Sequence, residues 1–104
     1  MIGVDLVNIA EFERQIQLGG IAFLQKAFTV SELQDQRVHH LAGMWAAKEA
    51  VIKASGAAPQ IMTEILIVFD SSGRPHGKFG PHDFEVSIAH HGGHAISVAC
   101  MIKV

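Results

Sequence analysis

The chain has 104 residues, of which 49% are hydrophobic and 17% charged, and its net charge is −2. A chain of this length can bury only one hydrophobic core, so residues 1–104 are predicted to form a single domain. The small negative charge and the lack of a basic cluster exclude nucleic acid as an expected partner. We find neither a signal peptide nor an apolar run long enough to span a bilayer, which predicts a cytoplasmic protein without membrane contact.

The first 27 residues are predicted to form a strand followed by helix. Apolar residues alternate with other residues over 2–7, as in a short strand. Asn8 is placed to cap the helix that follows, and the Gly19–Gly20 pair is expected to end that helix. A second segment then covers residues 21–27.

The next two helices have recognisable end signals. Thr29 lies three residues before Glu32, which is the spacing of a capping box and predicts a short helix from about Thr29 to Gln36. The longest helix is expected to begin near His39 or His40 and to end at Gly56, because a glycine can adopt the left-handed conformation that closes a helix.

The second half of the chain is predicted to contain three strands. Residues 64–70 form a β-branched apolar strand, and the SSGRP turn closes it. Residues 75–83 are rich in Gly, Pro and His and are expected to form a loop. Two alternating runs, 85–90 and 94–102, are joined by Gly92–Gly93, a strong hairpin signal. This order of elements predicts an α+β fold with helices packed on one face of a mainly antiparallel sheet.

The longest predicted helix carries Lys48, Glu49 and Lys53 within an apolar run. Glu49 and Lys53 are one turn apart on the same face, and such a pair on a solvated surface would stabilise the helix by about 0.2–0.5 kcal/mol. The alanines around them suggest a different interpretation, in which a ligand lies against this shallow face.

Asp5 is unusual because it lies between apolar residues of the first strand. An unpaired carboxylate in such a place is costly unless a cation or hydrogen-bond donors compensate it. Asp5 could cap the following helix. Together with Glu49 it could instead form a magnesium site, because Mg²⁺ is often held by two carboxylates, water and substrate phosphates.

His90 lies where a predicted strand enters the hairpin turn, so its ring can reach solvent or a phosphate. A zinc site of His90, His91 and His94 is an alternative. However, ligands spread across a Gly-Gly turn do not hold a tetrahedral geometry without further support.

Five segments, GVDLV, FTVSEL, AGMWAAKEAVIKA, DSSGRP and VSIAHHGGHAISVA, occur in this order with compatible spacing. Together they resemble the phosphopantetheinyl transferases, specifically the short holo-acyl-carrier-protein synthase type. The resemblance implies the 4′-phosphopantetheinyl transferase-like fold. It also implies an enzyme that transfers 4′-phosphopantetheine from coenzyme A to a serine of an acyl carrier protein. The enzyme would require Mg²⁺, would release adenosine 3′,5′-bisphosphate and would serve fatty acid biosynthesis. A homotrimer with active sites between subunits is also implied.

The resemblance further implies roles for individual residues. Asp5 and Glu49 are expected to bind Mg²⁺, and Glu49 to orient or deprotonate the serine. Lys53 is expected to contact the phosphates and to protonate the leaving group. The remaining expected contacts to coenzyme A are Lys48, Gly73, Arg74, Pro75 and His90.

Three departures from the family pattern support an alternative, a catalytically weak or inactive relative that binds coenzyme A or a carrier without transfer. Met44 stands where the family usually has an arginine, Glu11 and Glu13 make the first helix acidic, and the 56–64 segment is short. A third hypothesis is an unrelated α+β domain with a chance motif match, in which the histidines bind zinc.

Overall fold

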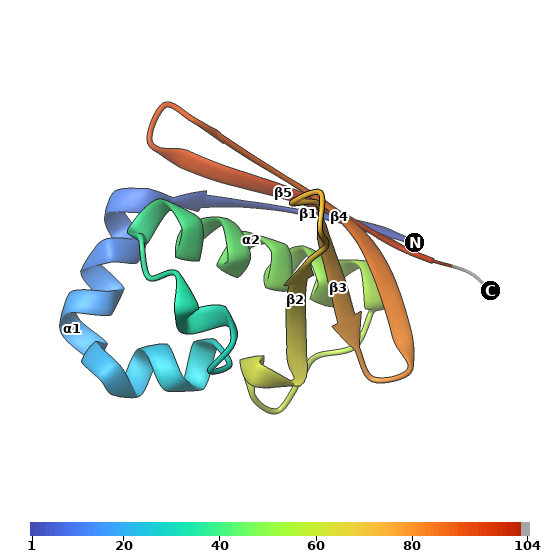
Figure 1. The fold of residues 1–104 in the computed structure, drawn as a ribbon, viewed down its shortest axis with the longest axis horizontal. Helices are drawn as coiled ribbons and strands as arrows, with labels where there is room; N and C mark the ends of the chain where they lie inside the picture. The colour runs from blue at the N-terminus through green and yellow to red at the C-terminus, as the bar shows by residue number, and fades with distance from the viewer. Residues whose placement is uncertain (103–104) are drawn as a thin grey trace.

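The computed structural model describes residues 1–102 as two helices packed against a five-stranded sheet (Figure 1). The strand order is β1-β5-β4-β3-β2, and all neighbouring strands are antiparallel. The predicted α+β class, with helices on one face of the sheet, is confirmed. The elements are β1 (Ile2–Asn8), α1 (Ile9–Ala27), η1 (Glu32–Gln34), α2 (Val38–Ser55), η2 (Met62–Glu64), β2 (Ile65–Phe69), β3 (Pro75–Phe79), β4 (His82–His91) and β5 (His94–Met101).

Local capping explains where the first helices begin and end. The Asn8 side chain accepts a hydrogen bond from the Glu11 amide at 3.0 Å, as predicted for the N-cap of α1. Gly20 interrupts this helix with φ 60°, and the helix resumes as far as Ala27. The predicted capping box is also present. The Glu32 carboxylate accepts a hydrogen bond from the Thr29 amide at 2.8 Å, and the Thr29 hydroxyl accepts one from the Glu32 amide at 3.3 Å.

The helix that this box was expected to start is only the 3₁₀ turn η1. Asp35 already has extended backbone, with φ −117° and ψ 111°, and its carboxylate accepts hydrogen bonds from the Arg37 amide and guanidinium. These local bonds satisfy the polar groups that a longer helix would otherwise have used.

The expectation of a loop over residues 75–83 is wrong, because this segment contains β3 and the start of β4. Gly77 pairs with Ile67 of β2 and with Phe84 of β4. A Cβ atom at Gly77 would lie 3.0 Å from the Val51 side chain of α2. The glycine therefore permits close packing of strand on helix, rather than a turn.

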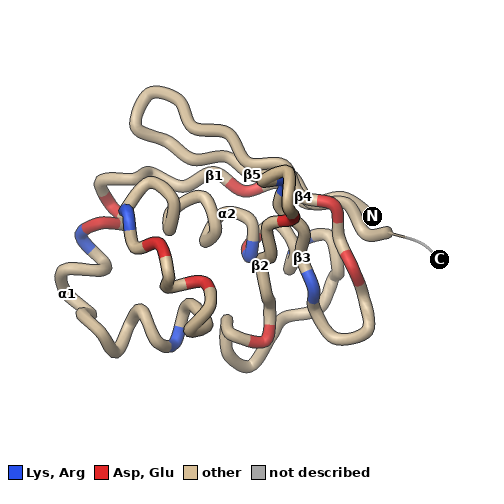
Figure 2. Tube along the Cα trace, in the orientation of Figure 1, with Lys and Arg blue, Asp and Glu red and all other residues tan. Residues whose placement is uncertain are grey.

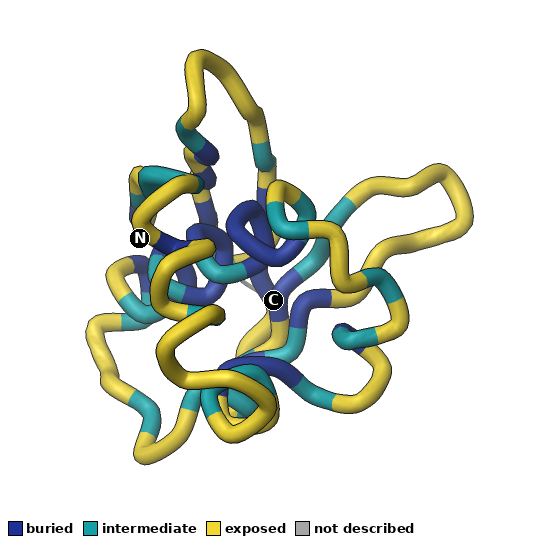
Figure 3. Tube along the Cα trace, turned by 90° about the vertical axis from the view of Figure 1, so that its left-hand side faces the viewer, coloured by how far each residue is buried: buried dark blue, intermediate teal, exposed yellow. Residues whose placement is uncertain are grey.

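Helix α2 lies directly on the sheet and forms the centre of the core. A Cβ atom at Gly3 of β1 would lie 2.1 Å from the Ala50 carbonyl oxygen, so only glycine allows this approach. Ala42, Ala46 and Ala50 are fully buried. Buried stretches accordingly gather near the middle of the molecule (Figure 3). The alanines themselves are therefore covered by the protein's own fold and do not form a ligand surface, whereas Glu49 beside them lines a cleft.

Aromatic rings fix α1 against α2. Phe12, Phe23 and Phe28 surround Trp45, with ring centroids 5.8–6.3 Å from the indole. Edge and tilted arrangements at these separations are favourable beyond the area that they bury. The first turns of α1 are thereby held beside the middle of α2.

The face of the sheet opposite α2 is apolar and uncovered within the chain (Figure 1). We call it the outer sheet face and define it by Ile2, Val4, Leu6, Ile96 and Val98, whose side chains are exposed. Cross-strand pairs Val4–Val98 and Leu6–Ile96 make it continuous over β1 and β5. Contiguous exposed apolar surface of this kind marks an interaction site.

Within residues 1–102, no helix has the length and apolar character needed to cross a membrane. Lys and Arg are scattered along the trace among Asp and Glu (Figure 2).

Candidate active site

The first group of predicted site residues meets where β1 crosses α2. Strand alternation turns Gly3, Asp5 and Val7 towards α2, opposite to the outer sheet face. The Lys53 ammonium donates to the Asp5 carboxylate at 3.0 Å and to the Val4 carbonyl at 3.0 Å. The Asp5 side chain is only 17% exposed. Asp5 is therefore held by a cation, and Asn8 rather than Asp5 caps the helix.

Glu49 lies one turn before Lys53 and shares a cleft of about 240 Å³ with Asp5. Partial burial raises the pKa of the Glu49 carboxyl, the Asp5 charge raises it further, and Lys53 opposes both. Two carboxylates thus face one cleft with a single ammonium to compensate them. This arrangement attracts an additional cation.

The site offers only two carboxylates, which suits Mg²⁺ better than it suits a metal that is enclosed entirely by protein ligands. Among residues 1–102, no three His, Cys, Asp or Glu side chains are grouped so that they could hold a metal ion. Mg²⁺ commonly takes only one or two carboxylates and completes its shell with water and substrate phosphates. Asp5 and Glu49 could therefore hold it, whereas the described histidines do not form the zinc site of the third hypothesis.

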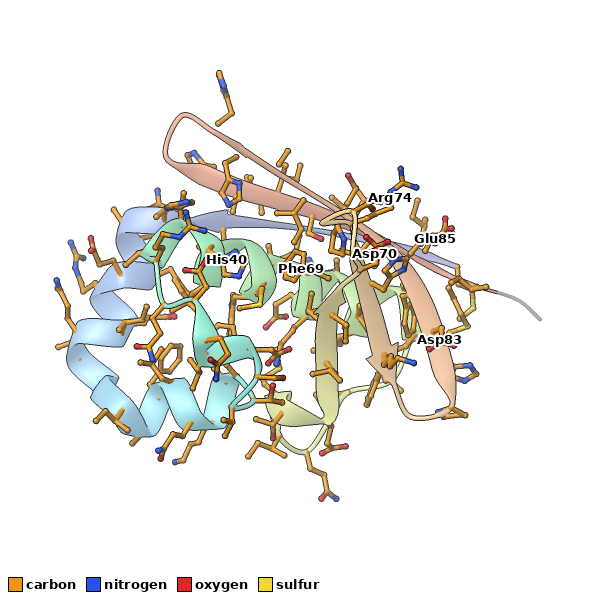
Figure 4. The ribbon with its side chains drawn as sticks, in the orientation of Figure 1. His40, Phe69, Asp70, Arg74, Asp83 and Glu85 are labelled. Carbon is orange, nitrogen blue, oxygen red and sulfur yellow. The ribbon has the colours of Figure 1, made fainter. Side chains whose placement is uncertain are left out.

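A second group of predicted residues lies around the other end of α2. Gly73, Pro75 and His90 line one cavity of about 210 Å³ together with His40 and Phe69. The rings of His40 and Phe69 are 5.4 Å apart (Figure 4). Burial lowers the pKa of His40. The structure therefore brings three of the expected coenzyme A contacts together.

His90 is held in this cavity by the start of α2. Its Nε2 donates to the His39 carbonyl at 2.8 Å. A Cβ atom at Gly43 would lie 3.1 Å from that nitrogen, so glycine leaves space for the ring. The imidazole is consequently fixed by the backbone, and one edge of it still lines the cavity.

Arg74 is not part of this cavity. It lines a separate cleft of about 540 Å³ on the outer side of the sheet, together with Glu85, Val98 and Cys100. In Figure 4 its side chain lies apart from His40 and Phe69. Pro75 lines both hollows, whereas Arg74 lines only the one on the outer side and Gly73 only the cavity that contains His90.

The prediction that Lys48 contacts coenzyme A is wrong. Its side chain is fully buried, and its ammonium donates to the Glu32 carboxylate at 2.6 Å and to the carbonyls of Ala27 and Met62 at 2.9 and 3.3 Å. All three N–H groups are therefore used inside the protein. Burial lowers the pKa of Lys48, and the hydrogen bond to Glu32 counteracts this.

The sequence did contain a signal for the buried lysine. Lys48 falls at helical spacing on the stripe formed by Leu41, Met44 and Val51, all of which are buried. A charge on a core stripe requires a buried partner. The capping residue Glu32 supplies it, and its second carboxylate oxygen accepts from the Ile67 amide at 2.8 Å.

Sequence reasoning did not place the first helix in the site. The cap residue Asn8, Glu11 and Gln15 of α1, and Trp45 of α2 line the cleft that holds Asp5 and Glu49. The spacing of Asn8, Glu11 and Gln15, one helical turn apart, is the signal that could have shown their common face.

Comparisons with known proteins agree on one family. A sequence model of the 4′-phosphopantetheinyl transferase superfamily matches residues 1–99. The holo-[acyl-carrier-protein] synthase of Sulfurovum sp. is 35% identical over 112 residues, which cover 96% of this chain and 94% of the relative. That of Mycobacterium ulcerans is 37% identical over 123 residues, with coverage of 96% and 94%.

The solved structures agree with these sequences. The crystal structure of Helicobacter pylori holo-[acyl-carrier-protein] synthase in complex with coenzyme A is 27% identical and superposes with a TM-score of 0.89, covering 98% of this chain and 100% of that one. The chain therefore belongs to the 4′-phosphopantetheinyl transferase superfamily, as an enzyme of the holo-[acyl-carrier-protein] synthase type.

Proposed function

We propose that this protein transfers 4′-phosphopantetheine from coenzyme A to a serine of an acyl carrier protein, with Mg²⁺, and releases adenosine 3′,5′-bisphosphate. The observation that carries the proposal is that Asp5 and Glu49 line one cleft in a chain of this family, with the Lys53 ammonium bonded to Asp5. Coenzyme A bound to the Helicobacter pylori relative supports the identity of the donor. The reaction would serve fatty acid biosynthesis in the cytoplasm.

Asp5 and Glu49 would hold the magnesium ion. When bound, the metal supplies positive charge that stabilises the pyrophosphate and the leaving phosphate. Lys53 lies beside Asp5 with a side chain 53% exposed, so its ammonium can turn from the carboxylate to a phosphate oxygen. There it would neutralise the leaving bisphosphate or give it a proton.

Glu49 is suited to receive the proton of the incoming serine. Its carboxylate lines the cleft and can accept that proton directly or through a water molecule. The serine oxygen forms a new bond to the phosphorus that carries pantetheine. The bond from that phosphorus to the bridging oxygen breaks, and adenosine 3′,5′-bisphosphate leaves with the electron pair.

A homotrimer would unite the two groups of site residues. Gly43 and Glu49 are six residues apart on α2, which separates them by about 9 Å along the axis and turns them to different sides of the helix. The Gly73, Pro75 and His90 cavity therefore does not adjoin the Asp5 cleft within one chain. The apolar outer sheet face offers the surface on which neighbouring copies could pack and bring the two together.

We expect Leu6→Lys to convert the trimer to monomer, because it places a charge on the outer sheet face. Sedimentation velocity would measure the change. Leu18→Lys is the matched control, since Leu18 of α1 is 83% exposed and lies off that face. A trimer that persists in Leu6→Lys, or wild-type protein that sediments as a monomer, would contradict this assembly.

The direct test of the function is intact-mass spectrometry of several apo acyl carrier proteins incubated with the protein, coenzyme A and Mg²⁺. We expect a phosphopantetheine adduct on at least one carrier and none when EDTA is present. Coenzyme A binding in calorimetry without an adduct on any carrier would instead establish the inactive relative.

A further inference from the structure

Ser97 of β5 is a buried polar residue without a partner. Its side chain is 1% exposed, and its hydroxyl makes no hydrogen bond within residues 1–102. A buried hydroxyl that is left unpaired destabilises the fold, so each such group requires an explanation. Alanine, which occupies the inward-facing positions 95 and 99 on either side, would fill this place at lower cost.

The strand register places Ser97 directly opposite Asp5. The two residues are paired across β1 and β5, and partners in an antiparallel pair project to the same face, with Cβ atoms about 4.5–5.5 Å apart. The residue opposite Ser97 on its other side is Ile88, which offers no hydrogen-bonding group. Asp5 is therefore the acceptor that lies across the strand from this hydroxyl.

In the described state the Asp5 carboxylate is engaged by Lys53. The proposed function replaces this ammonium with a metal ion, and Lys53 turns to the phosphates. A carboxylate that binds a metal is commonly oriented by a hydrogen bond from a neighbouring group. Ser97 has a free hydroxyl, the correct face and a rotatable O–H with which to supply that bond.

We propose that Ser97 is a positioning residue, whose hydroxyl donates to the Asp5 carboxylate when Asp5 binds the metal. In the metal-free protein, the unpaired hydroxyl lowers the stability of the fold. In the metal-bound site, the same hydroxyl donates its hydrogen bond to Asp5. This inference rests on the proposed function, because it requires Asp5 to be a metal ligand.

The test measures two quantities that should change in opposite directions in Ser97→Ala. Binding of Mn²⁺ in the presence of coenzyme A, followed by electron paramagnetic resonance of the free ion, should weaken roughly 10-fold. Thermal unfolding in EDTA should shift upwards by roughly 4–8 °C, because the variant no longer buries an unpaired hydroxyl.

Two further variants separate positioning from packing. Ser97→Thr retains a hydroxyl and should bind Mn²⁺ within about threefold of the wild type, well short of the loss expected for Ser97→Ala. Ser87→Ala makes the same chemical change at an exposed position of β4, and neither quantity should change.

Asp5→Asn distinguishes failure of this inference from failure of the proposed function. If Asp5→Asn weakens Mn²⁺ binding and Ser97→Ala does not, Ser97 has no positioning role. If Asp5→Asn has no effect on Mn²⁺ binding, the metal site itself is misplaced. Equal weakening by Ser97→Ala and Ser87→Ala would also overturn the assignment of Ser97.

Discussion

Glu49→Gln is expected to reduce phosphopantetheine transfer by roughly 100-fold or more, because the amide neither carries the charge that binds a metal nor accepts the serine proton. The measurement is kcat/KM from the rate of carrier modification at saturating Mg²⁺. Asp83→Asn is the matched control, since Asp83 is exposed on β4 and does not line the cleft. Full activity of Glu49→Gln would remove Glu49 from the mechanism.

The same substitution should not harm the metal-free fold. The folded-state pKa of Glu49 is raised, so between its unfolded and folded pKa values the native protein binds more protons than the unfolded chain. Stability is therefore lost as pH rises across this window, and the loss persists at neutral pH. Glu49→Gln has no carboxyl to titrate and so avoids this loss of stability. The variant should be at least as stable as the wild type in EDTA at neutral pH. Its advantage should disappear below the ordinary glutamate pKa of about 4.3.

Thermal unfolding in EDTA between about pH 4 and 8 would test whether the stability difference changes with pH in this direction. An advantage of Glu49→Gln that grows towards low pH would contradict a raised pKa of Glu49 in the folded protein. Glu13→Gln is the control for the chemical change itself, because Glu13 is exposed on α1 and does not line the cleft.

Lys48→Met is expected to destabilise the protein by roughly 3–5 kcal/mol, because it leaves the buried Glu32 carboxylate without its cation. Urea unfolding would measure the loss. The matched control is Lys53→Met on the same helix. Its ion pair with Asp5 is partly exposed and contributes at most about 1 kcal/mol, although its loss should strongly impair transfer.

A double variant identifies the cause of the Lys48 effect. Lys48→Met combined with Glu32→Gln should be less destabilised than the sum of the two single changes, because no uncompensated charge is then buried. Had Lys48 bound coenzyme A, Lys48→Met would instead raise KM for coenzyme A and leave stability unchanged. That result would return Lys48 to the coenzyme A site.

The sequence was sufficient where a residue's role depends on its neighbours along the chain. Asn8, the Thr29–Glu32 box and the Gly92–Gly93 turn are local devices, and the structure contains all three. The juxtaposition of Asp5 with Glu49 and Lys53 is a long-range contact. The pairing of Asp5 with Glu49 was one of two alternatives that the unusual carboxylate in the first strand suggested, and the family resemblance was needed to choose it, because no local rule joins a first strand to a later helix.

Two of the errors share one physical origin, which is packing between distant segments. Gly77 suggested a loop by composition, but its small size serves the contact with Val51. Lys48 was assigned to coenzyme A from the family resemblance, although it falls on the core stripe of its helix, and its partner Glu32 lies sixteen residues away. The contact of Gly77 with Val51 and the identity of Glu32 as the partner become visible only when the helix has been placed on the sheet.

The buried Lys48–Glu32 pair also bears on how the protein folds. Its hydrogen bonds join the end of α1, η1, the middle of α2, η2 and β2, so the ammonium and the carboxylate are both satisfied only when all five segments have assembled. A partly folded form that lacks one of them would bury a charge without its partners. The native state is therefore expected to open as one cooperative unit in this region. The Ile67 amide should accordingly exchange its hydrogen only through global unfolding.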